Sequence, residues 1–340
     1  MKFAAIGRTR LLYDAIEACT QEGHEAVWIA TAREAPEYDR TQDDFEALAG
    51  RLGCAFHRGP KIHAPDAIAS ARQSDAEVAI SVNWPTLLRG PLRDCFADGI
   101  VNCHGGDLPR FRGNACQAWA IILGESQVVI SLHEMVDALD AGPIYLQRSI
   151  PIDGATTIGE LQTAMTAQVP TMFVELLNGL ANRTLPAPRP QPEDPSLALR
   201  THSRRPSDGL LNWSQSAIDL DRLIRASSEP LAGAYTALEG RRLRVWRAAV
   251  VPTVAPEVAI PGQVVELHNE QGAADIATGS GRLRVLELQP EGSQRCPATE
   301  VLGSTRQRLG PSAEQMAFEA FTRIAELEAR LAALEDERNG

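Results

Sequence analysis

The sequence predicts an α/β protein with a doubly wound, mostly parallel N-terminal sheet, a small C-terminal β-barrel and a final helix. Residues 1–150 alternate short apolar runs with amphipathic stretches, the rhythm of strand-helix-strand units. A proline-rich stretch follows the last of these units, and several short strand-like segments follow the prolines. The 340 residues are enough for two domains with separate cores.

The N-terminal half supplies the strands and helices of the predicted sheet. Apolar runs at 3–6, 25–31 and 78–82 indicate buried strands, and apolar spacing at 10–22 and 43–53 indicates amphipathic helices. The first strand leads into Gly-Arg-Thr-Arg and not into Gly-x-Gly-x-x-Gly. This argues against a dinucleotide-dependent dehydrogenase.

A long helix over 156–182 closes the first domain, with a threonine N-cap and an acidic residue in its first turn. We therefore expect a first domain at 1–183. Residues 184–204 contain Pro-Ala-Pro-Arg-Pro-Gln-Pro, which favours an extended, semi-rigid linker.

Residues 205–306 have the spacing of a small β domain. A helix is expected at 218–226, and strands are expected at 242–247, 262–267, 274–278 and 283–288.

The final segment, 311–338, is a strong helix former with an apolar seam. The seam residues recur at steps of four and three: Ala320, Ile324, Leu327, Leu331 and Leu334. Two interpretations remain open, a short coiled coil that joins two copies as a homodimer, and an amphipathic helix lying on its own domain.

Composition and charge restrict the compartment and the partners. The chain is 44% hydrophobic and 23% charged, with six scattered cysteines and no zinc-type spacing. No apolar run reaches the roughly 18 residues of a membrane span, and the N-terminus does not resemble a secretion signal. We expect a cytoplasmic protein that binds no membrane. A net charge of −11 argues against a nucleic-acid partner but not against a small nucleotide.

A first motif places polar groups at the end of a buried strand. Asn102 and His104 follow the apolar run 99–101, and side chains two residues apart leave a strand on the same face. An amide beside a histidine at a strand end is a candidate oxyanion and acid-base pair. The alternative is a polar loop whose side chains only cap a helix.

A second motif adds a carboxylate. Asp140-Ala141-Gly142 follows the apolar run 128–130 and precedes another strand-like segment. With Asn102-x-His104 and the loop Leu108-Pro109-Arg110-Phe111-Arg112-Gly113, this order resembles the folate-dependent formyltransferase family. That family includes methionyl-tRNA, glycinamide ribonucleotide and nucleotide-sugar formyltransferases. Gly106-Asp107 departs from the Ser-Leu that relatives often carry, which leaves the shape of the substrate loop open.

The resemblance extends beyond residue 205. The segment resembles the OB-like C-terminal domain of methionyl-tRNA formyltransferase and of the aminoarabinose-pathway enzyme. The matching stretches are 211–213, 224–226, 243–246 and 288–292. The resemblance thus implies a Rossmann-like N-terminal domain and an OB-like barrel.

The resemblance also implies a reaction. The donor is N10-formyltetrahydrofolate, the acceptor is a primary amine, and no metal takes part. The amine attacks the formyl carbon directly, through a tetrahedral intermediate. Asn102 donates to the oxyanion, His104 donates to the oxygen or accepts the amine proton, and Asp140 favours the charged imidazole.

The remaining site residues are expectations from the same resemblance. Binding of the folate is assigned to two loops, at Asn83, Trp84, Leu88, Val136 and Asp137. Binding of the acceptor is assigned to Gly106, Asp107 and Arg112. The alternative role for Arg112 is to brace its loop. We expect His133 to fill a core position or to support the site, and Trp119 to be a core residue of the following helix.

The acceptor predicted here is a nucleotide-linked amino sugar, whose diphosphate needs one or two arginines. The candidates are Arg110, Arg112, Arg204, Arg205 and Arg225. Alternatives are methionyl-tRNA, hydroxyornithine in siderophore synthesis, water in a formyltetrahydrofolate hydrolase, and a non-catalytic scaffold. The hydrolases usually carry an N-terminal regulatory domain, whereas this chain starts at the first strand.

Overall fold

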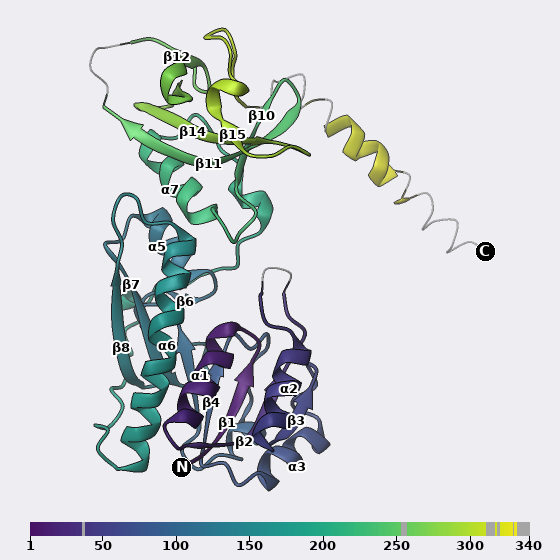
Figure 1. Cartoon of the computed structure of the whole chain (residues 1–340), viewed down its shortest axis with the longest axis vertical. Helices are drawn as coiled ribbons and strands as arrows, with labels where there is room; N and C mark the ends of the chain where they lie inside the picture. The colour runs from purple at the N-terminus through teal and green to yellow at the C-terminus, as the bar shows by residue number, and fades with distance from the viewer. Residues whose placement is uncertain (36–37, 253–256, 311–316, 318–319, 329, 332–340) are drawn as a thin grey trace, which may run out of the picture. The chain divides into compact units, whose positions relative to one another are not determined.

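The chain folds into two compact units, Met1–Arg204 and Arg205–Gly340 (Figure 1). This computed structural model describes residues 1–340 except 36–37, 253–256, 311–316, 318–319, 329 and 332–340. Each unit has its own sheet, so the predicted mixture of a mostly parallel sheet and a second, smaller β unit is confirmed.

A seven-stranded sheet of order β3-β2-β1-β4-β5-β7-β8 forms the centre of the first unit. The five strands from β3 to β5 are mutually parallel, whereas β7 runs antiparallel to both β5 and β8. The strands are β1 (Lys2–Gly7), β2 (Glu25–Thr31), β3 (Ala55–Arg58), β4 (Val78–Val82), β5 (Ile100–His104), β7 (Gln127–Glu134) and β8 (Ile144–Pro151).

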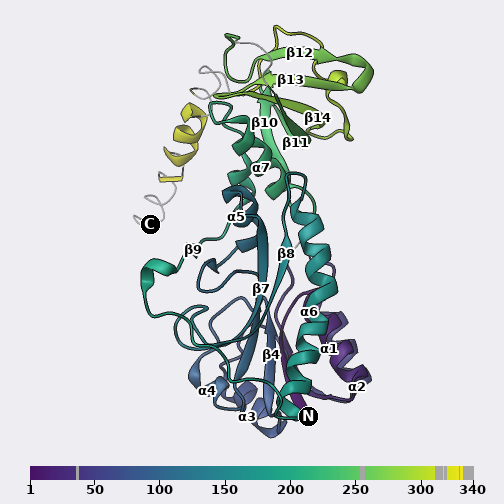
Figure 2. The same cartoon turned by 90° about the vertical axis from the view of Figure 1, so that its left-hand side faces the viewer.

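Helices cover both faces of this sheet, with α1, α2 and α6 on one side and α3 and α4 on the other (Figure 2). The central strand β1 is apolar at successive positions because both of its faces are buried. Thr157 caps α6 with Glu160 in a capping box, as the sequence predicted. The helices are α1 (Arg10–Gln21), α2 (Gln42–Leu52), α3 (Pro65–Gln73), α4 (Gly90–Arg93), α5 (Cys116–Leu123) and α6 (Ile158–Ala181).

The proline-rich segment 184–204, expected as an extended, semi-rigid linker between the domains, packs on the first unit. Arg189 exchanges two main-chain hydrogen bonds of 2.8 Å with Ile144. Further along, β9 (Arg200–Thr201) pairs in parallel with β6 (Arg112–Gly113). Proline keeps the segment extended, and the residues between the prolines supply the N–H groups that fasten it. The segment is therefore part of the first unit.

The second unit is a six-stranded antiparallel sheet of order β10-β11-β14-β13-β12, with β15 paired to β14. Inside its core, the Trp213 indole donates to the Thr236 hydroxyl at 2.9 Å. The elements are β10 (Ala234–Leu238), β11 (Arg241–Val251), β12 (Val264–His268), β13 (Ala273–Ala277), β14 (Arg282–Pro290), β15 (Cys296–Pro297) and α7 (Ala217–Ser227). Across both units, single 3₁₀ turns occur at Pro195–Leu197, Pro206–Gly209, Asn269–Gln271 and Ala298–Glu300.

The helix expected at 311–338 is helical at its described positions from 320 to 331. The rest of that range, including the last seam residue Leu334, lies mostly outside the described residues. Within the described part of the chain, every helix is too short or too polar to cross a lipid bilayer.

Candidate active site

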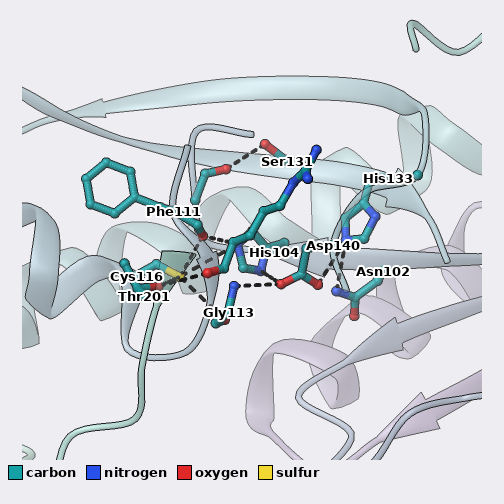
Figure 3. Close-up of polar contacts among 12 residues, drawn as sticks. Asn102, His104, Phe111, Gly113, Cys116, Ser131, His133, Asp140 and Thr201 are labelled. Atoms are coloured by element: carbon teal, nitrogen blue, oxygen red, sulfur yellow. Dashed lines mark hydrogen bonds and ion pairs between the residues drawn. The ribbon is translucent and has the colours of Figure 1, made fainter. Parts of the chain in front are cut away.

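The end of β5 carries the first two site residues. Asn102 and His104 are two positions apart on the strand and line a cavity of about 410 Å³. Figure 3 shows their side chains close to Asp140. His104 is 7% exposed, so its ring is largely removed from bulk water. The buried strand thus holds both polar groups at the wall of a cavity large enough for a small molecule.

Asp140 reaches the cavity from the loop after β7. Because β7 runs antiparallel to β5, the C-terminal end of β7 pairs with the start of β5 and lies away from His104. The loop 135–143 crosses back, and Asp140 turns within it at a left-handed φ of 49°. A side chain at Gly142 would put its Cβ 1.9 Å from the Glu134 carbonyl oxygen, so this turn requires glycine.

Main-chain and side-chain bonds hold Asp140 in position. The Gly113 N–H donates to Asp140 Oδ2 at 2.8 Å. The Gln191 amide donates to the main-chain oxygens of Asp140 and Gly142, each at 2.8 Å. Gln191 belongs to the proline-rich segment, so that segment directly supports the site.

His104 has a potential acceptor at each ring nitrogen. Nδ1 lies 3.7 Å from Asp140 Oδ2, and Nε2 donates to the Phe111 carbonyl at 2.6 Å. Cys116 Sγ lies 3.6 Å from Nε2. Burial by itself lowers the pKa of His104, but Cys116, the Asp140 carboxylate and the Phe111 carbonyl together raise it to about 9. The imidazolium form is therefore favoured at neutral pH.

His133, the second histidine beside Asp140, is neutral where His104 is charged. The strand register sets it opposite Asn102, and its Nδ1 donates to the Glu134 carbonyl at 2.9 Å. Burial and the charge on His104 lower the pKa of His133 to about 4. Its Nε2 is then an acceptor, and Asn102 Nδ2 lies 3.3 Å from it. One N–H of Asn102 is fixed by this bond, and the other is available to the cavity.

The cavity is lined by some of the residues expected to bind the folate. Asn83 and Trp84 are in the lining, together with Pro85, Thr86 and Leu87. Leu88 lies in the hydrophobic core beneath, at 2% exposure.

The second loop contributes different residues from those expected. Val136 and Asp137 are outside the lining, which instead contains Met135 and Leu139. The Asp137 carboxylate accepts from Arg93 at 2.7 Å.

Residues expected to bind the acceptor surround the loop after His104. A Cβ at Gly106 would lie 2.6 Å from His104 Nε2 and 2.5 Å from the Phe111 oxygen, so glycine leaves room for that bond. Gly106 and Asp107 line a second, smaller cavity of about 70 Å³. Arg112 donates to the Gln191 side-chain oxygen at 3.1 and 2.5 Å. This bond braces the loop against the proline-rich segment.

Sequence reasoning missed Cys116 and only partly described His133 and Trp119. Cys116 is 4% exposed and donates to the Phe111 oxygen at 3.0 Å, the same oxygen that His104 contacts. Its signal was weak, because a cysteine after an Arg-Gly loop has no characteristic spacing. Trp119 lies in α5 but is half-buried, and its indole donates to the His202 carbonyl at 2.8 Å.

Comparison with known proteins gives matches over most of the chain. Residues 1–177 match the family model described as formyl transferase, and residues 204–306 match the model of the formyl transferase C-terminal domain. A methionyl-tRNA formyltransferase of Herpetosiphon aurantiacus is 28% identical over 303 residues, which are 88% of this chain and 96% of the relative.

Solved structures share the fold at lower identity. The N-formyltransferase of Helicobacter canadensis, solved with folinic acid and dTDP-3-aminofucose, matches with a TM-score of 0.61 at 12% identity. That match covers 87% of this chain and all of the other. HypX of Aquifex aeolicus with tetrahydrofolic acid matches with a TM-score of 0.56 at 18% identity, over 90% of this chain. This chain spans about half the length of HypX, 47%.

Proposed function

The chain belongs to the formyl transferase family, and from this premise we propose that it transfers the formyl group of N10-formyltetrahydrofolate to a primary amine of a nucleotide-linked amino sugar. The observation that carries the proposal is the convergence of Asn102, His104 and Asp140 on one cavity. An amide donor, a cationic imidazole and a carboxylate suit acyl transfer to an amine.

The cavity fits a folate donor in size and chemistry. Its volume of about 410 Å³ is in the range of small-molecule sites, and the indole of Trp84 and the side chain of Leu87 give it an apolar part. The polar groups gather at the other part, around His104. When bound, the donor supplies an activated formyl carbon. We assign Asn83, Trp84, Leu139 and the neighbouring main chain to holding it.

The side chains then serve three tasks. Asn102 directs its available N–H toward the oxygen that becomes negative when the amine nitrogen attacks the formyl carbon. His104, as imidazolium, gives up its Phe111 contact to donate to that oxygen, and then protonates N10 as the carbon–N10 bond breaks. The amine loses one proton, which returns His104 to its starting form. Asp140 stabilises the imidazolium form of His104 before it gives up its proton and again after the amine proton returns to it.

The acceptor assignment rests on charge. A transfer RNA would bring dozens of phosphates to a chain of net charge −11, whereas a nucleotide diphosphate needs only one or two arginines. At least three of the five candidate arginines already have partners. Arg110 bonds Glu125, Arg112 bonds Gln191 and Arg225 bonds Asp221. A sugar nucleotide must therefore exchange with one of these partners or bind elsewhere.

Methionyl-tRNA is the second candidate acceptor, because the methionyl-tRNA formyltransferase of Herpetosiphon aurantiacus matches 88% of this chain. Hydroxyornithine is a third candidate acceptor. The three candidates can be told apart by testing them in one panel with the same formyl donor.

The test offers N10-formyltetrahydrofolate with each acceptor in a separate reaction and measures tetrahydrofolate release and the formylated product by mass spectrometry. The panel holds 3-amino and 4-amino sugars on dTDP, UDP and GDP, methionyl-tRNA, and hydroxyornithine. Formylation of one amino sugar with tRNA inert supports the proposal. Efficient formylation of the tRNA with every sugar inert would overturn it. The His104→Ala variant is the control for uncatalysed transfer.

A further inference from the structure

A helix runs over 320–328 and continues at positions 330 and 331 (Figure 1, yellow helix). Several large apolar side chains of this helix are exposed. Ile324 is 49% exposed, Leu327 is 48% exposed and Leu331 is 59% exposed. Residues three and four apart lie on the same side of a helix, so these three form one stripe. Two core residues of the second unit, Leu220 and Ile224 of α7, are at most 1% exposed. The stripe is therefore an open apolar face.

The spacing of the stripe is that of a coiled-coil seam. Ile324 and Leu331 are seven residues apart and occupy heptad position a, and Leu327 between them occupies position d. In the sequence, Ala320 and Leu334 continue the same steps of four and three. At the first a position, β-branched Ile324 followed by Leu327 at d favours two strands over three or four. This pattern points to one partner helix of the same kind.

The charges beside the stripe select both the partner and its direction. Arg323 and Arg330 occupy position g, and Glu328 occupies position e. In a parallel pair, a g residue meets the e residue five positions further along the partner, so Arg323 faces Glu328. In the sequence, Glu335 stands five residues after Arg330, with the same signs. An antiparallel pair would set g against g and e against e, which brings arginine to arginine and glutamate to glutamate.

We propose that this face binds the same face of a second copy of the chain, as a parallel two-stranded coiled coil. The occupant is a second copy because one sequence supplies both members of each opposite-charge pair. The described seam is short, so the association is concentration-dependent and weakens as salt screens the flanking pairs. The proposal does not depend on the reaction or its acceptor.

The test measures the dimer of the full chain by sedimentation equilibrium, across a concentration series and at two salt concentrations. Arg323→Glu and Glu328→Arg each bring like charges together in both symmetric pairs, so each should weaken the dimer at least tenfold. The double variant Arg323→Glu/Glu328→Arg restores opposite charges and should regain most of that loss. A dimer that none of these changes affects, or a chain that stays monomeric throughout, would overturn the proposal.

A matched control separates the contact from the helix itself. Arg323 also bonds Glu326 within its own helix at 2.8 Å, and Glu326 is at position c, away from the seam. Glu326→Arg breaks that internal pair and should leave the dimer unchanged. A loss as large as that of Arg323→Glu would assign the effect to helix stability and contradict the proposal.

The direction is tested by cross-linking. Leu331→Cys puts one thiol at an a position, which meets its own copy only in a parallel pair. Mild oxidation should give a disulfide dimer in this variant and not in the natural chain. The same treatment of a Glu326→Cys variant should give little dimer. Absence of the Leu331→Cys cross-link in a sample that sedimentation shows to be dimeric would exclude the parallel arrangement.

Discussion

Each unit of the molecule holds a histidine beside an aspartate, and the pair in the first unit lines a cavity of about 410 Å³. In the first unit, His104 Nδ1 lies 3.7 Å from Asp140. In the second unit, His268 Nε2 lies 3.1 Å from Asp275, which is 1% exposed. Judged by separation and burial alone, the second pair is the tighter one.

A third residue makes the difference. Arg284 donates to both oxygens of Asp275, at 2.6 and 3.0 Å. Although burial acts to raise the pKa of Asp275, its bonds to Arg284 and His268 lower it below its usual value. The charge of this aspartate is thus compensated within the protein. The ligand atoms of Glu266, His268 and Asp275 all lie within 4.8 Å of one another, but Arg284 already takes the oxygens that a cation would need.

Asp140, by contrast, receives a main-chain N–H and faces two imidazoles. Its charge therefore acts on His104, and together with the Cys116 and Phe111 contacts it raises the pKa of His104 to about 9. The two pairs thus differ in the cation beside the aspartate, which is Arg284 in the second unit and His104 itself in the first unit, where a cavity also adjoins the pair.

The largest expected effect is a difference in the rate of formyl transfer between variants of the two aspartates. Asp140→Asn should lower the rate of formyl transfer by two decades or more, about 3 kcal/mol of transition-state stabilisation, while the fold survives. Asp275→Asn should leave the rate within a few-fold of the natural chain. The measurement is kcat/KM for both purified variants. Near-normal turnover of Asp140→Asn would remove the assignment of the site.

The second effect concerns the His268–Asp275 pair, where a substitution should change the stability of the second unit. Asp275→Ala leaves Arg284 without its carboxylate in a partly buried position, at a cost of roughly 2 kcal/mol to the second unit. Denaturant unfolding should reveal an earlier transition for this variant, with folate binding by the first unit retained. An unchanged transition would show that the Arg284 pair contributes nothing measurable.

The third effect is a pH dependence. The pKa of His104 in the folded chain, about 9, is above its ordinary value of 6.5. Its stabilising contribution is therefore complete below pH 6.5 and is lost as the pH rises through 9. Activity that needs the imidazolium falls over the same alkaline range. In Asp140→Asn the alkaline limb of the residual rate should move to lower pH, and an unmoved limb would disconnect Asp140 from the charge on His104.

The smallest effect concerns the thiol beside His104. Cys116→Ala removes its bond to the Phe111 oxygen and should lower the rate by less than tenfold, about 1 kcal/mol. Cys116→Ser keeps a donor there and should retain more activity than Cys116→Ala. Equal rates for the two variants would show that the donor itself is unimportant.

Much of the framework could be predicted from the sequence because it depends on local patterns. The apolar runs gave strands at 25–31 and 78–82 that coincide with β2 and β4. The helix over 156–182 could be predicted from its capping residues and the spacing of its apolar residues alone. The structure has this helix at Ile158–Ala181.

The site was only partly accessible to such reasoning, because its remaining contacts join distant segments. The antiparallel direction of β7 sets His133 opposite Asn102, and strand direction has no local signature. Gln191 and Cys116 reach the site from segments whose own patterns indicate only a proline-rich linker and a helix start. Contacts between segments far apart in the sequence determine the positions of these residues.

The most direct test of the account compares His104→Ala with His268→Ala in one assay, with N10-formyltetrahydrofolate and the best acceptor of the panel. We predict that His104→Ala loses at least two decades of kcat/KM, whereas His268→Ala stays within a few-fold of the natural chain. Equal rates for the two variants, either both normal or both lost, would contradict the assignment of formyl transfer to the pair in the first unit.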